Sequence, residues 1–404
     1  MGEKELRHFF EDYLQKDPLF KDKKALQSHY TPKSVPHRDD QIKILAGILA
    51  PALRGEKPSN VFVYGKTGTG KTLCVKHVSY NMMNLAKERN IPFFVSYLNC
   101  KMKRVADTEY RLVAHLAREF GVDVPATGLP TDEIYKVFVS ELDKRGILLI
   151  IILDEIDQLV IKTGDEILYN FTRLGSELKN SQMSIIGISN DLVFTDNLDP
   201  RVKSSLSEEE LVFPPYNAVQ LQKILVQRAK IGFKDGVVDE GVIEKCAAYA
   251  AREHGDARRA LELLRVAGEL AERSNSQQVT VEFIDMAEEK IERDRILDIV
   301  HTQPKQFKLT LFSIFHTTMH DNGRQQVFTS DIYDFYKDSC YKTGIKPLTQ
   351  RRVSDIIAEL DMQGIINAKV ISKGRYGRTR QITLAIPQST IPKVQTILKE
   401  GLNL

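Results

Sequence analysis

Apolar runs of strand length alternate with amphipathic stretches through the first half of the chain. Four runs have the length and apolar content of buried strands: VFVYG (61–65), PFFVSYLN (92–99), ILLIIIL (147–153) and MSIIGISN (183–190). The spacing of apolar residues around them predicts helices from Asp39, at 71–89, and at about 108–120, 131–144 and 165–179. Strands that are apolar throughout are covered on both faces, so the alternation predicts an α/β fold with a parallel, doubly wound sheet.

After Pro214-Pro215 the pattern changes, and four helical stretches follow without a strand. They lie at about 218–231, 239–254, 256–274 and 280–293 and predict a small helical domain. Three more helices (about 308–320, 329–343 and 349–363) then precede NAKVIS and TRQITLAI, two strand-like runs that flank the turn KGRYGR. This is the element order of a winged helix. The predicted divisions are an N-terminal segment (1–38), an α/β domain (39–215), a helical domain (216–296) and a winged-helix domain (297–404).

The composition is that of a globular chain, with 42% hydrophobic and 27% charged residues among 404. No apolar stretch approaches the ~20 residues that span a bilayer, and the charged N-terminus does not resemble a signal peptide. We therefore expect a cytoplasmic protein without a membrane partner. The four cysteines form no C-x-x-C pair, which argues against a zinc site or a disulfide framework. His316 and His320 have metal-ligand spacing but lack the glutamate of a zinc-protease motif, and are interpreted as ordinary helix residues.

The net charge of +3 is unevenly distributed. Residues 301–404 contain 15 Lys and Arg against 8 Asp and Glu, a net of +7, whereas the first 300 residues carry a net of −4. The stretch 362–399 contains no acidic residue. A basic C-terminal part indicates a polyanionic partner, with a solvated basic face as the alternative.

The segment GKTGTGKT (65–72) fits the pattern G-x-x-x-x-G-K-[ST] and joins a predicted strand to a predicted helix. In that setting, backbone N–H groups and the helix N-terminus bind the phosphates of a nucleotide. We expect Lys71 to reach the β- and γ-phosphates and Thr72 to ligate Mg²⁺; a glycine-rich surface turn is the alternative. The predicted nucleotide contacts in this segment are Gly65, Thr67, Gly68, Thr69, Gly70, Lys71, Thr72 and Leu73.

Polar residues follow two of the predicted strands at the sheet edge where ligands bind. Asp154 and Glu155 end the run 147–153, and the expectation is that Asp154 holds Mg²⁺ while Glu155 polarises the attacking water. Asn190 ends the next strand and is a candidate for orienting that water. Acidic residues also end strands merely by meeting solvent, and asparagine is a common turn residue.

Two arginines are candidates for reading the γ-phosphate. Arg201, in LDPRVKSS, lies on a loop and is a candidate finger for a neighbouring subunit's nucleotide. Arg258 lies one turn into a helix that Asp256 is predicted to cap, from where it could reach the chain's own nucleotide. Arg259 is interpreted as a solvated neighbour. Surface or structural ion pairs are the alternatives for both candidates.

These motifs occur in an order that resembles one family. GKTGTGKT, LDEID, ISN, DPRVKSSLSEEEL, FPPYNA and REHGDARRALELLRVAGE lie between SVPHRDDQI and TQRRVSDIIAELD. Together they closely resemble archaeal replication-origin initiators, relatives of the first subunit of the origin recognition complex and of its loading factor. The resemblance spans about residues 28–385. It implies an α/β AAA+ P-loop ATPase core with a parallel sheet, an α-helical lid domain and a C-terminal winged-helix domain.

The resemblance also implies roles that the residues alone do not suggest. Tyr216 and Arg228 resemble nucleotide contacts at the base of the lid, and Pro36-His37-Arg38 resembles the segment that lies over the adenine. The stretch at about 108–135 resembles a helical insertion that touches DNA. Arg111 is its best-placed cation, with a solvated helix face as the alternative.

In winged helices the third helix usually enters the major groove, while the hairpin meets the backbone or the minor groove. Basic residues with an aromatic at a hairpin tip suit such contacts, although a basic hairpin could also serve a protein contact. The candidate DNA-binding residues are Thr349, Gln350, Arg351 and Arg352 in the helix and Lys373, Arg375, Tyr376, Arg378 and Arg380 in the hairpin.

The expected function is that of an ATP/ADP switch with Mg²⁺ and slow hydrolysis, associated with the nucleoid. As the resemblance implies, it would bind double-stranded origin DNA and help to recruit the replicative helicase, with paralogous initiator subunits as further candidate partners. Two other classes fit parts of the pattern: a signalling scaffold NTPase with a winged helix, and a transcription regulator with a vestigial ATP fold. The acid-free stretch 362–399 argues against the first, and the complete set Lys71, Asp154, Glu155 and Arg258 argues against the second.

Overall fold

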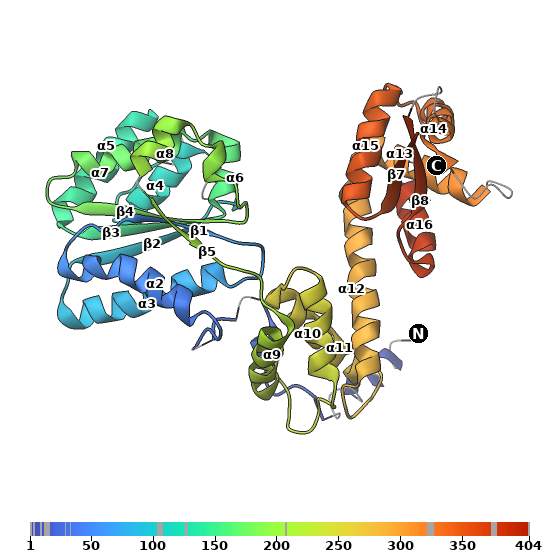
Figure 1. Ribbon diagram of the computed structural model, residues 1–404, viewed down its shortest axis with the longest axis horizontal. Helices are drawn as coiled ribbons and strands as arrows, with labels where there is room; N and C mark the ends of the chain where they lie inside the picture. The colour runs from blue at the N-terminus through green and yellow to red at the C-terminus, as the bar shows by residue number, and fades with distance from the viewer. Residues whose placement is uncertain are drawn as a thin grey trace. The chain divides into compact units, whose positions relative to one another are not determined.

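The computed structural model describes residues 2, 5–8, 10, 11, 17–28, 30–32, 34–102, 108–125, 128–206, 208–320, 327–372 and 378–402. The chain divides into two compact units, Met1–Ile284 and Asp285–Leu404 (Figure 1). The division falls inside helix α12 (Val281–Thr302), so the predicted boundary between residues 296 and 297 lies within a continuous helix.

The first unit contains a parallel sheet of five strands in the order β2-β3-β4-β1-β5. The strands are β1 (Asn60–Tyr64), β2 (Phe93–Asn99), β3 (Leu148–Asp154), β4 (Gln182–Ser189) and β5 (Glu208–Val212). The four predicted strands are present, and the predicted α/β class is confirmed. β5 was not predicted, because its sequence EEELV has no apolar run. It needs none, since it lies at the sheet edge beside β1, where Val212 is 56% exposed.

Apolar side chains of the strands alternate between the two faces of the sheet. In β1, Val61 and Val63 pack in one buried cluster with helices α2 and α3, whereas Phe62 packs in another with α4, α5, α7 and α8 (Figure 1). Burying one such side chain contributes about 2 kcal/mol, so this two-sided core holds the strand ends firmly. The helices are α2 (Asp39–Leu49), α3 (Lys71–Arg89), α4 (Glu109–Glu119), α5 (Thr131–Arg145), α6 (Ile156–Thr163), α7 (Glu166–Glu177) and α8 (Pro200–Leu206).

Helix α4 belongs to this core. It buries Leu112, Val113 and Leu116, while Arg111 is exposed on its outer side. The segment predicted as a DNA-contacting insertion, about 108–135, is therefore built on a core helix that presents Arg111 outward.

The lid is a bundle of helices, as predicted. It comprises α9 (Ala218–Gly232), α10 (Val242–Arg252), α11 (Ala257–Arg273) and the start of α12. Asp256 caps α11 as predicted, since its carboxylate accepts the backbone N–H of Arg258 at 2.7 Å. A capping box of Asn217 and Gln220 begins α9.

Part of the N-terminal segment packs on the lid. The Phe20 ring stacks on Phe233 with centroids 4.7 Å apart, and Lys23 forms an ion pair of 2.8 Å with Glu269. Gly268 of α11 makes room for this contact, because a Cβ there would lie 2.6 Å from Phe20 Cζ. The segment then runs from the lid to α2. It therefore connects the lid to the α/β domain that contains the five-stranded sheet, which is called the base below.

The second unit is a winged helix, as predicted. Its helices and strands are α13 (Lys305–His320), β6 (Val327–Phe328), α14 (Thr329–Thr343), α15 (Gln350–Met362), β7 (Ile366–Ser372), β8 (Arg378–Leu384) and α16 (Ile391–Leu402). The strands form an antiparallel sheet in the order β6-β8-β7. The apolar residues of α15 (Val353, Ile356, Ile357 and Leu360) are buried. Helix α16, which was not predicted, packs on α13.

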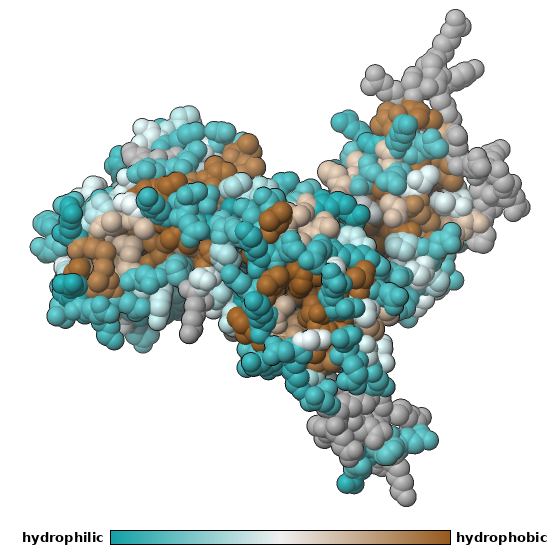
Figure 2. Space-filling model, turned by 60° about the horizontal axis from the view of Figure 1, so that its bottom comes forward, coloured by the Kyte–Doolittle hydropathy of each residue, from teal (hydrophilic) through white to brown (hydrophobic). Residues whose placement is uncertain are grey.

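Hydrophilic residues cover most of the described surface visible in Figure 2. Within the described part of the chain, no helix combines the length and the apolar character that crossing a membrane requires. The side chains of the four cysteines are buried. The His316 ring stacks on Phe335 with centroids 3.9 Å apart, a packing role that suits the interpretation as an ordinary helix residue.

Candidate functional site

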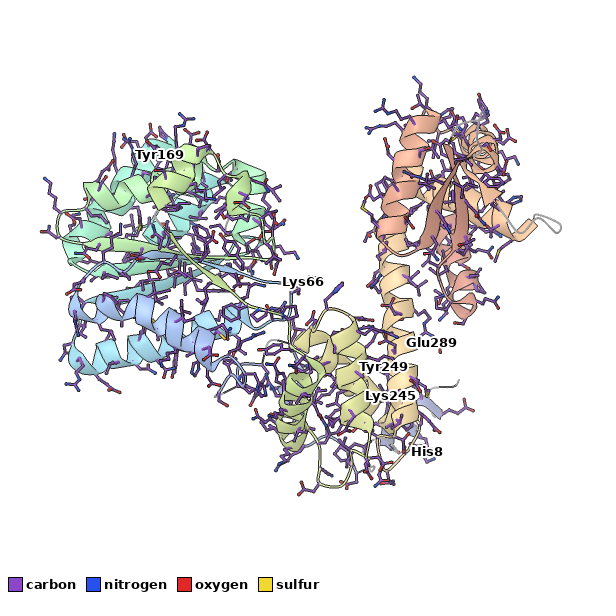
Figure 3. The ribbon with its side chains drawn as sticks, viewed as in Figure 1. His8, Lys66, Tyr169, Lys245, Tyr249 and Glu289 are labelled. Carbon is purple, nitrogen blue, oxygen red and sulfur yellow. The ribbon has the colours of Figure 1, made fainter. Side chains whose placement is uncertain are left out.

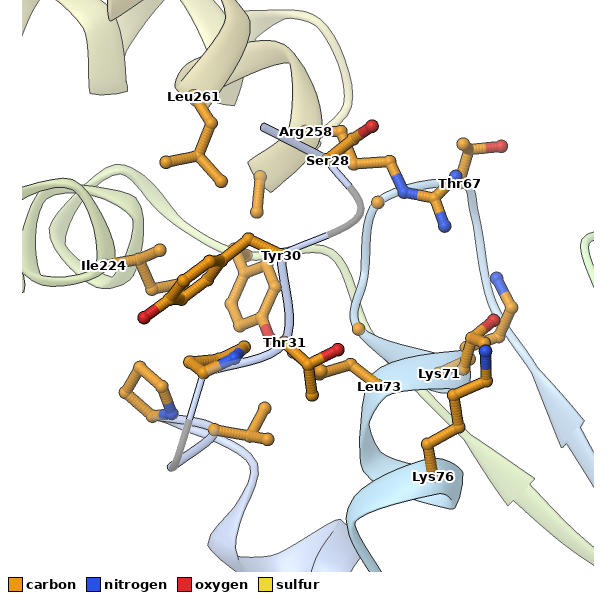
Figure 4. A pocket seen from close by; sticks show the side chains of 18 of the residues that line it. Ser28, Tyr30, Thr31, Thr67, Lys71, Leu73, Lys76, Ile224, Arg258 and Leu261 are labelled. Carbon is orange, nitrogen blue, oxygen red and sulfur yellow. The ribbon is translucent and has the colours of Figure 1, made fainter. Parts of the chain in front are cut away.

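A cavity of about 760 Å³ lies in the first unit between the carboxyl ends of the sheet strands and the lid. One part of its wall is polar and includes Lys71, Thr72, Asp154, Glu155, Asn190 and Arg258. Another part is apolar and includes Val35, Leu73, Ile224, Ile231 and Leu261. Figure 4 shows Ile224 and Leu261 on the lid side of Tyr30, and Lys71 on the base side. A cavity that is charged at one side and apolar at the other suits a nucleotide with its phosphates and its base.

The loop 65–70 wraps closely at the polar side because glycines occupy its tightest points. Gly68 and Gly70 have φ values of 72° and 89°, which favour glycine. A Cβ at Gly68 would lie 1.6 Å from Asp256 Oδ1, so the loop touches the N-terminus of lid helix α11. The N–H of Ala257 also donates to Gly68 O at 3.2 Å. Figure 3 shows Lys66 of the same loop on the side of the base that faces the lid, and its Nζ is 3.4 Å from His254 Nδ1.

Lys71 is buried at the centre of the polar wall. Its ammonium donates to Gly65 O at 2.6 Å, to Lys66 O at 2.8 Å and to Asn190 Oδ1 at 2.9 Å. Burial, followed by the nearby charge of Arg258, lowers the pKa of Lys71 to about 8. The strand-ending Asn190 is thus brought against the lysine of the phosphate loop.

Asp154 and Thr72 meet where a metal ion would be held. Thr72 Oγ1 donates to Asp154 Oδ2 at 3.0 Å, and Tyr97 OH donates to the same oxygen at 2.6 Å. One carboxylate and one hydroxyl fit Mg²⁺, which takes its remaining ligands from water and substrate phosphates. Burial, followed by the hydrogen bond to Asp154, raises the pKa of Tyr97, so the phenol is protonated at neutral pH. The sequence pattern does not single out Tyr97, because only the pairing of β2 with β3 brings its side chain to Asp154.

Glu155 directly follows β3 in the left-handed region, with φ 56°. This conformation is unfavourable for a residue with a side chain, and such residues cluster at functional sites. Its carboxylate lines the cavity and is 3.8 Å from Lys101 Nζ. Glu155 and Asp154 are therefore directed into one cavity with the phosphate loop.

The two candidate arginines have different surroundings. Arg258 lines the cavity from the lid and extends toward the loop that carries Thr67 (Figure 4). Arg201 lies in the first turn of α8 and not on a loop as predicted; it is highly exposed, and its Nε donates to Asp199 at 3.1 Å. The interpretation of Arg259 as a solvated residue is wrong: its side chain is 12% exposed and forms an ion pair with Glu253 at 3.0 Å.

His37 and Arg38 lie beside the cavity; neither belongs to its described lining. Arg38 is 2% exposed and donates to Thr69 O at 3.0 Å and to Pro214 O at 2.6 Å. Its guanidinium lies 3.9 Å from the ring centroid of Tyr216, which does line the cavity. His37 lines a separate hollow beside α9. Arg38 is thus placed to support the phosphate loop from behind.

Arg38→Ala is expected to lower the free energy of unfolding of the first unit by about 3 kcal/mol, because two buried carbonyls lose their donor. The corresponding melting transition should fall by roughly 6–10 °C, measured by differential scanning calorimetry. Arg89→Ala at the exposed end of α3 is the matched control and should leave the transition in place. An unchanged transition in Arg38→Ala would contradict this supporting role.

Described residues between 28 and 36 supply a wall of the cavity that the sequence pattern largely does not indicate. The lining from this segment consists of Ser28, Tyr30, Thr31, Pro32, Ser34, Val35 and Pro36. Arg228 fastens it to the lid, donating to Ala25 O at 3.1 Å with its guanidinium 4.4 Å from the ring centroid of Tyr30. Arg228 is itself part of the wall, so this predicted nucleotide contact also orders the N-terminal segment.

The candidate DNA-binding helix of the second unit begins with polar, exposed residues. Thr349 caps α15 by accepting the N–H of Arg352, and Gln350, Arg351 and Arg352 are exposed. Arg380 of β8 donates to Ser354 O at 2.7 Å, which ties the hairpin to α15. The predictions for Lys373, Arg375 and Tyr376 fall outside the described residues, as does the side chain of Arg378.

A parallel sheet of this strand order, a phosphate loop and a helical lid, followed by a winged helix, define an AAA+ ATPase-type protein. Models of three families match the chain: the AAA domain at residues 54–193, the Cdc6 AAA+ ATPase-type lid domain at 222–289, and the CDC6 C-terminal winged helix domain at 298–394. An ORC1-type DNA replication protein of Thermococcus onnurineus is 53% identical over 390 residues, covering 96% of this chain and 93% of its own. That of Pyrococcus horikoshii is 52% identical over 393 residues, with coverage of 96% and 93%. The chain belongs to the family of ORC1-type DNA replication proteins, and the resemblance inferred from its motifs is confirmed.

Solved structures agree with this assignment. The Aeropyrum pernix ORC1 protein in complex with DNA is 45% identical, with a TM-score of 0.81 over 95% of this chain and 98% of that chain. The Aeropyrum pernix ORC2 protein is 22% identical, with a TM-score of 0.60 over 96% and 100%. At that identity the second likeness shows the fold alone, and the predicted fold class is confirmed by both.

Proposed function

We propose that this protein is an ATP-dependent DNA replication initiator that binds double-stranded origin DNA and helps to recruit the replicative helicase. The observation that carries the proposal is the likeness, over nearly the full length, to an ORC1 protein in complex with DNA. The phosphate loop, Asp154, Glu155 and Arg258 all line one cavity. This arrangement supports the proposal that the initiator depends on ATP.

In the proposed mechanism each polar residue of the cavity has one role. Lys71 would exchange its carbonyl partners for the β- and γ-phosphates. Thr72 and Asp154 would hold Mg²⁺, and the bound metal would supply positive charge beside the phosphate oxygens. Glu155 accepts the proton of the attacking water while Asn190 orients it. Hydrolysis is slow, as a switch requires.

Arg258 makes the lid sensitive to the nucleotide. It projects from the first turn of α11, and the same turn touches the phosphate loop through Asp256 and Gly68. Loss of the γ-phosphate removes the partner of Arg258, so the lid is released from the base. Arg201, exposed on the base, completes the site of a neighbouring initiator subunit on DNA.

Footprinting of genomic DNA from the source organism tests the proposed function. Protection of the replication origin in the presence of ATP and Mg²⁺ is the expected result. Protection of promoters alone would indicate a transcription regulator instead. No protection of either, with nucleotide binding intact, would favour a signalling scaffold.

Arg351→Ala/Arg352→Ala is expected to weaken origin binding by about 30- to 1,000-fold at physiological salt, since each of the two arginine contacts is worth about 1–2 kcal/mol. The slope of log affinity against log salt should fall by up to about 2 if both residues contact phosphates. Fluorescence anisotropy with a labelled origin fragment measures both quantities.

The matched control is Lys393→Ala/Lys399→Ala, which removes the same charge from exposed positions on α16. An equal loss of affinity in the control would point to net charge rather than to α15 as the cause. Unchanged binding in Arg351→Ala/Arg352→Ala would exclude α15 as a DNA contact.

A further inference from the structure

Tyr97 reaches the metal-binding carboxylate from the neighbouring strand. β2 and β3 are parallel, with Tyr97 opposite Ile152 and Asn99 opposite Asp154. Side chains two residues apart share a face of a strand, so Tyr97 and Asn99 point to the same side of the sheet. From there the phenol crosses to β3, and its hydroxyl is 2.6 Å from Asp154 Oδ2.

Three donors together fix the orientation of the Asp154 carboxylate. Oδ2 accepts from Tyr97 OH at 2.6 Å and from Thr72 Oγ1 at 3.0 Å, and Oδ1 accepts from the N–H of Glu155 at 3.1 Å. Two of these donors come from residues already assigned to the nucleotide site. Tyr97 is the third, and its hydrogen bond is the shortest of the set.

Helix α3 holds the Tyr97 ring from the other side. Lys76 Nζ lies 3.7 Å from the ring centroid, the geometry of a cation–π contact. Lys76 is one turn after Thr72, and residues four apart lie on the same face of a helix. Tyr97, Lys76 and Asn99 all line the cavity, so the tyrosine is clamped between the metal-binding carboxylate and the helix that begins at the phosphate loop.

We propose that Tyr97 is a positioning residue for Mg²⁺ binding: its hydroxyl holds Asp154 in the orientation that the metal requires, and Lys76 holds the ring. This inference rests on the proposed function, since it assigns a role within the ATP and Mg²⁺ site. Hydrogen-bond partners of metal ligands typically change metal affinity by about 10- to 100-fold when they are removed. The hydroxyl is the group that matters, because the ring packs equally well without it.

Tyr97→Phe removes that hydroxyl alone. The binding of N-methylanthraniloyl-ATP is measured by fluorescence after co-purifying nucleotide has been removed, first in EDTA and then during a titration with MgCl₂. The half-saturating Mg²⁺ concentration is expected to rise about 10-fold, whereas affinity in EDTA stays within about twofold of the wild type. Lys76→Met, which keeps the hydroxyl but frees the ring, is expected to give a smaller shift in the same direction.

The matched control is Tyr80→Phe, the same change at a residue of α3 that is 61% exposed; its Mg²⁺ titration should coincide with that of the wild type. An unchanged Mg²⁺ midpoint in Tyr97→Phe would overturn the inference. An equal loss of affinity with and without Mg²⁺ would also overturn it, since that pattern indicates a general disturbance of the pocket. A wild-type protein that binds no nucleotide would instead remove the proposed function, and this inference with it.

Discussion

Glu155→Gln is expected to slow ATP hydrolysis by about 100- to 1,000-fold in a single turnover while nucleotide affinity changes by less than about threefold. The amide keeps the size of the side chain but cannot accept a proton from water. The position suits a catalytic base, because Glu155 lies at the end of β3 with φ 56°, adjacent to the proposed metal ligand Asp154. Rapid-quench measurements with radiolabelled ATP report the chemical step directly.

Two control variants test whether the effect of Glu155→Gln on hydrolysis is specific to that residue. Glu177→Gln makes the same change at an exposed position near the end of α7 and should hydrolyse ATP at the wild-type rate. Lys101→Ala removes the cation that lies 3.8 Å from Glu155 and should alter hydrolysis much less than Glu155→Gln. Unchanged single-turnover hydrolysis in Glu155→Gln would refute the role of Glu155 as the base.

The sequence predicts well those parts of the site whose residues lie in short, contiguous segments. The segment 65–72 carries its own mechanism, because a phosphate loop needs glycines, a lysine and a hydroxyl at set spacings. Asp154 follows seven consecutive apolar residues, a pattern that both predicts a buried strand and places the carboxylate at its end. The cap Asp256 and the arginine two positions later likewise form a local signal.

The parts that sequence does not predict depend on contacts between distant segments. Tyr97 looks like one more aromatic residue in a strand until the register of β2 against β3 places it beside Asp154. The N-terminal segment is polar and rich in prolines, yet Phe20 packs on the lid and Tyr30 on Arg228. Each of these contacts joins residues more than 190 positions apart or residues on two neighbouring strands. The spacing of apolar residues along the chain does not indicate such contacts.

Arg38 illustrates a third kind of difference between motif and structure. Its motif resembles a segment that lies over the adenine, but the guanidinium is turned beneath the phosphate loop, toward Thr69 O and Pro214 O. A motif identifies a position that matters to the site and leaves open whether the side chain touches the ligand or the loop that holds it.

ATP affinity is expected to fall by up to about tenfold for each pH unit above 8. The pKa of Lys71 is lowered to about 8 in the free cavity, whereas bound phosphates would favour the protonated ammonium and raise that pKa. Because the bound state keeps the proton that the free state loses, affinity is full below about pH 8 and declines as pH rises from there toward the pKa of the bound state. Isothermal titration calorimetry with Mg-ATP between pH 7.5 and 9.5 measures the decline.

Substitutions at Lys71 separate this effect from others that depend on pH. Lys71→Ala should bind ATP about 100-fold more weakly at pH 7.5, since two charge-assisted hydrogen bonds are worth about 3 kcal/mol, and its affinity should vary little with pH. Lys71→Arg keeps a cation that stays protonated between pH 7.5 and 9.5. The ATP affinity that this variant retains should therefore also be independent of pH. A wild-type affinity that does not change up to pH 9.5 would show that the ammonium stays charged in the free cavity. In that case the hydrogen bonds to Gly65 O, Lys66 O and Asn190 Oδ1 stabilise the charged ammonium of Lys71 by more than burial and the charge of Arg258 destabilise it.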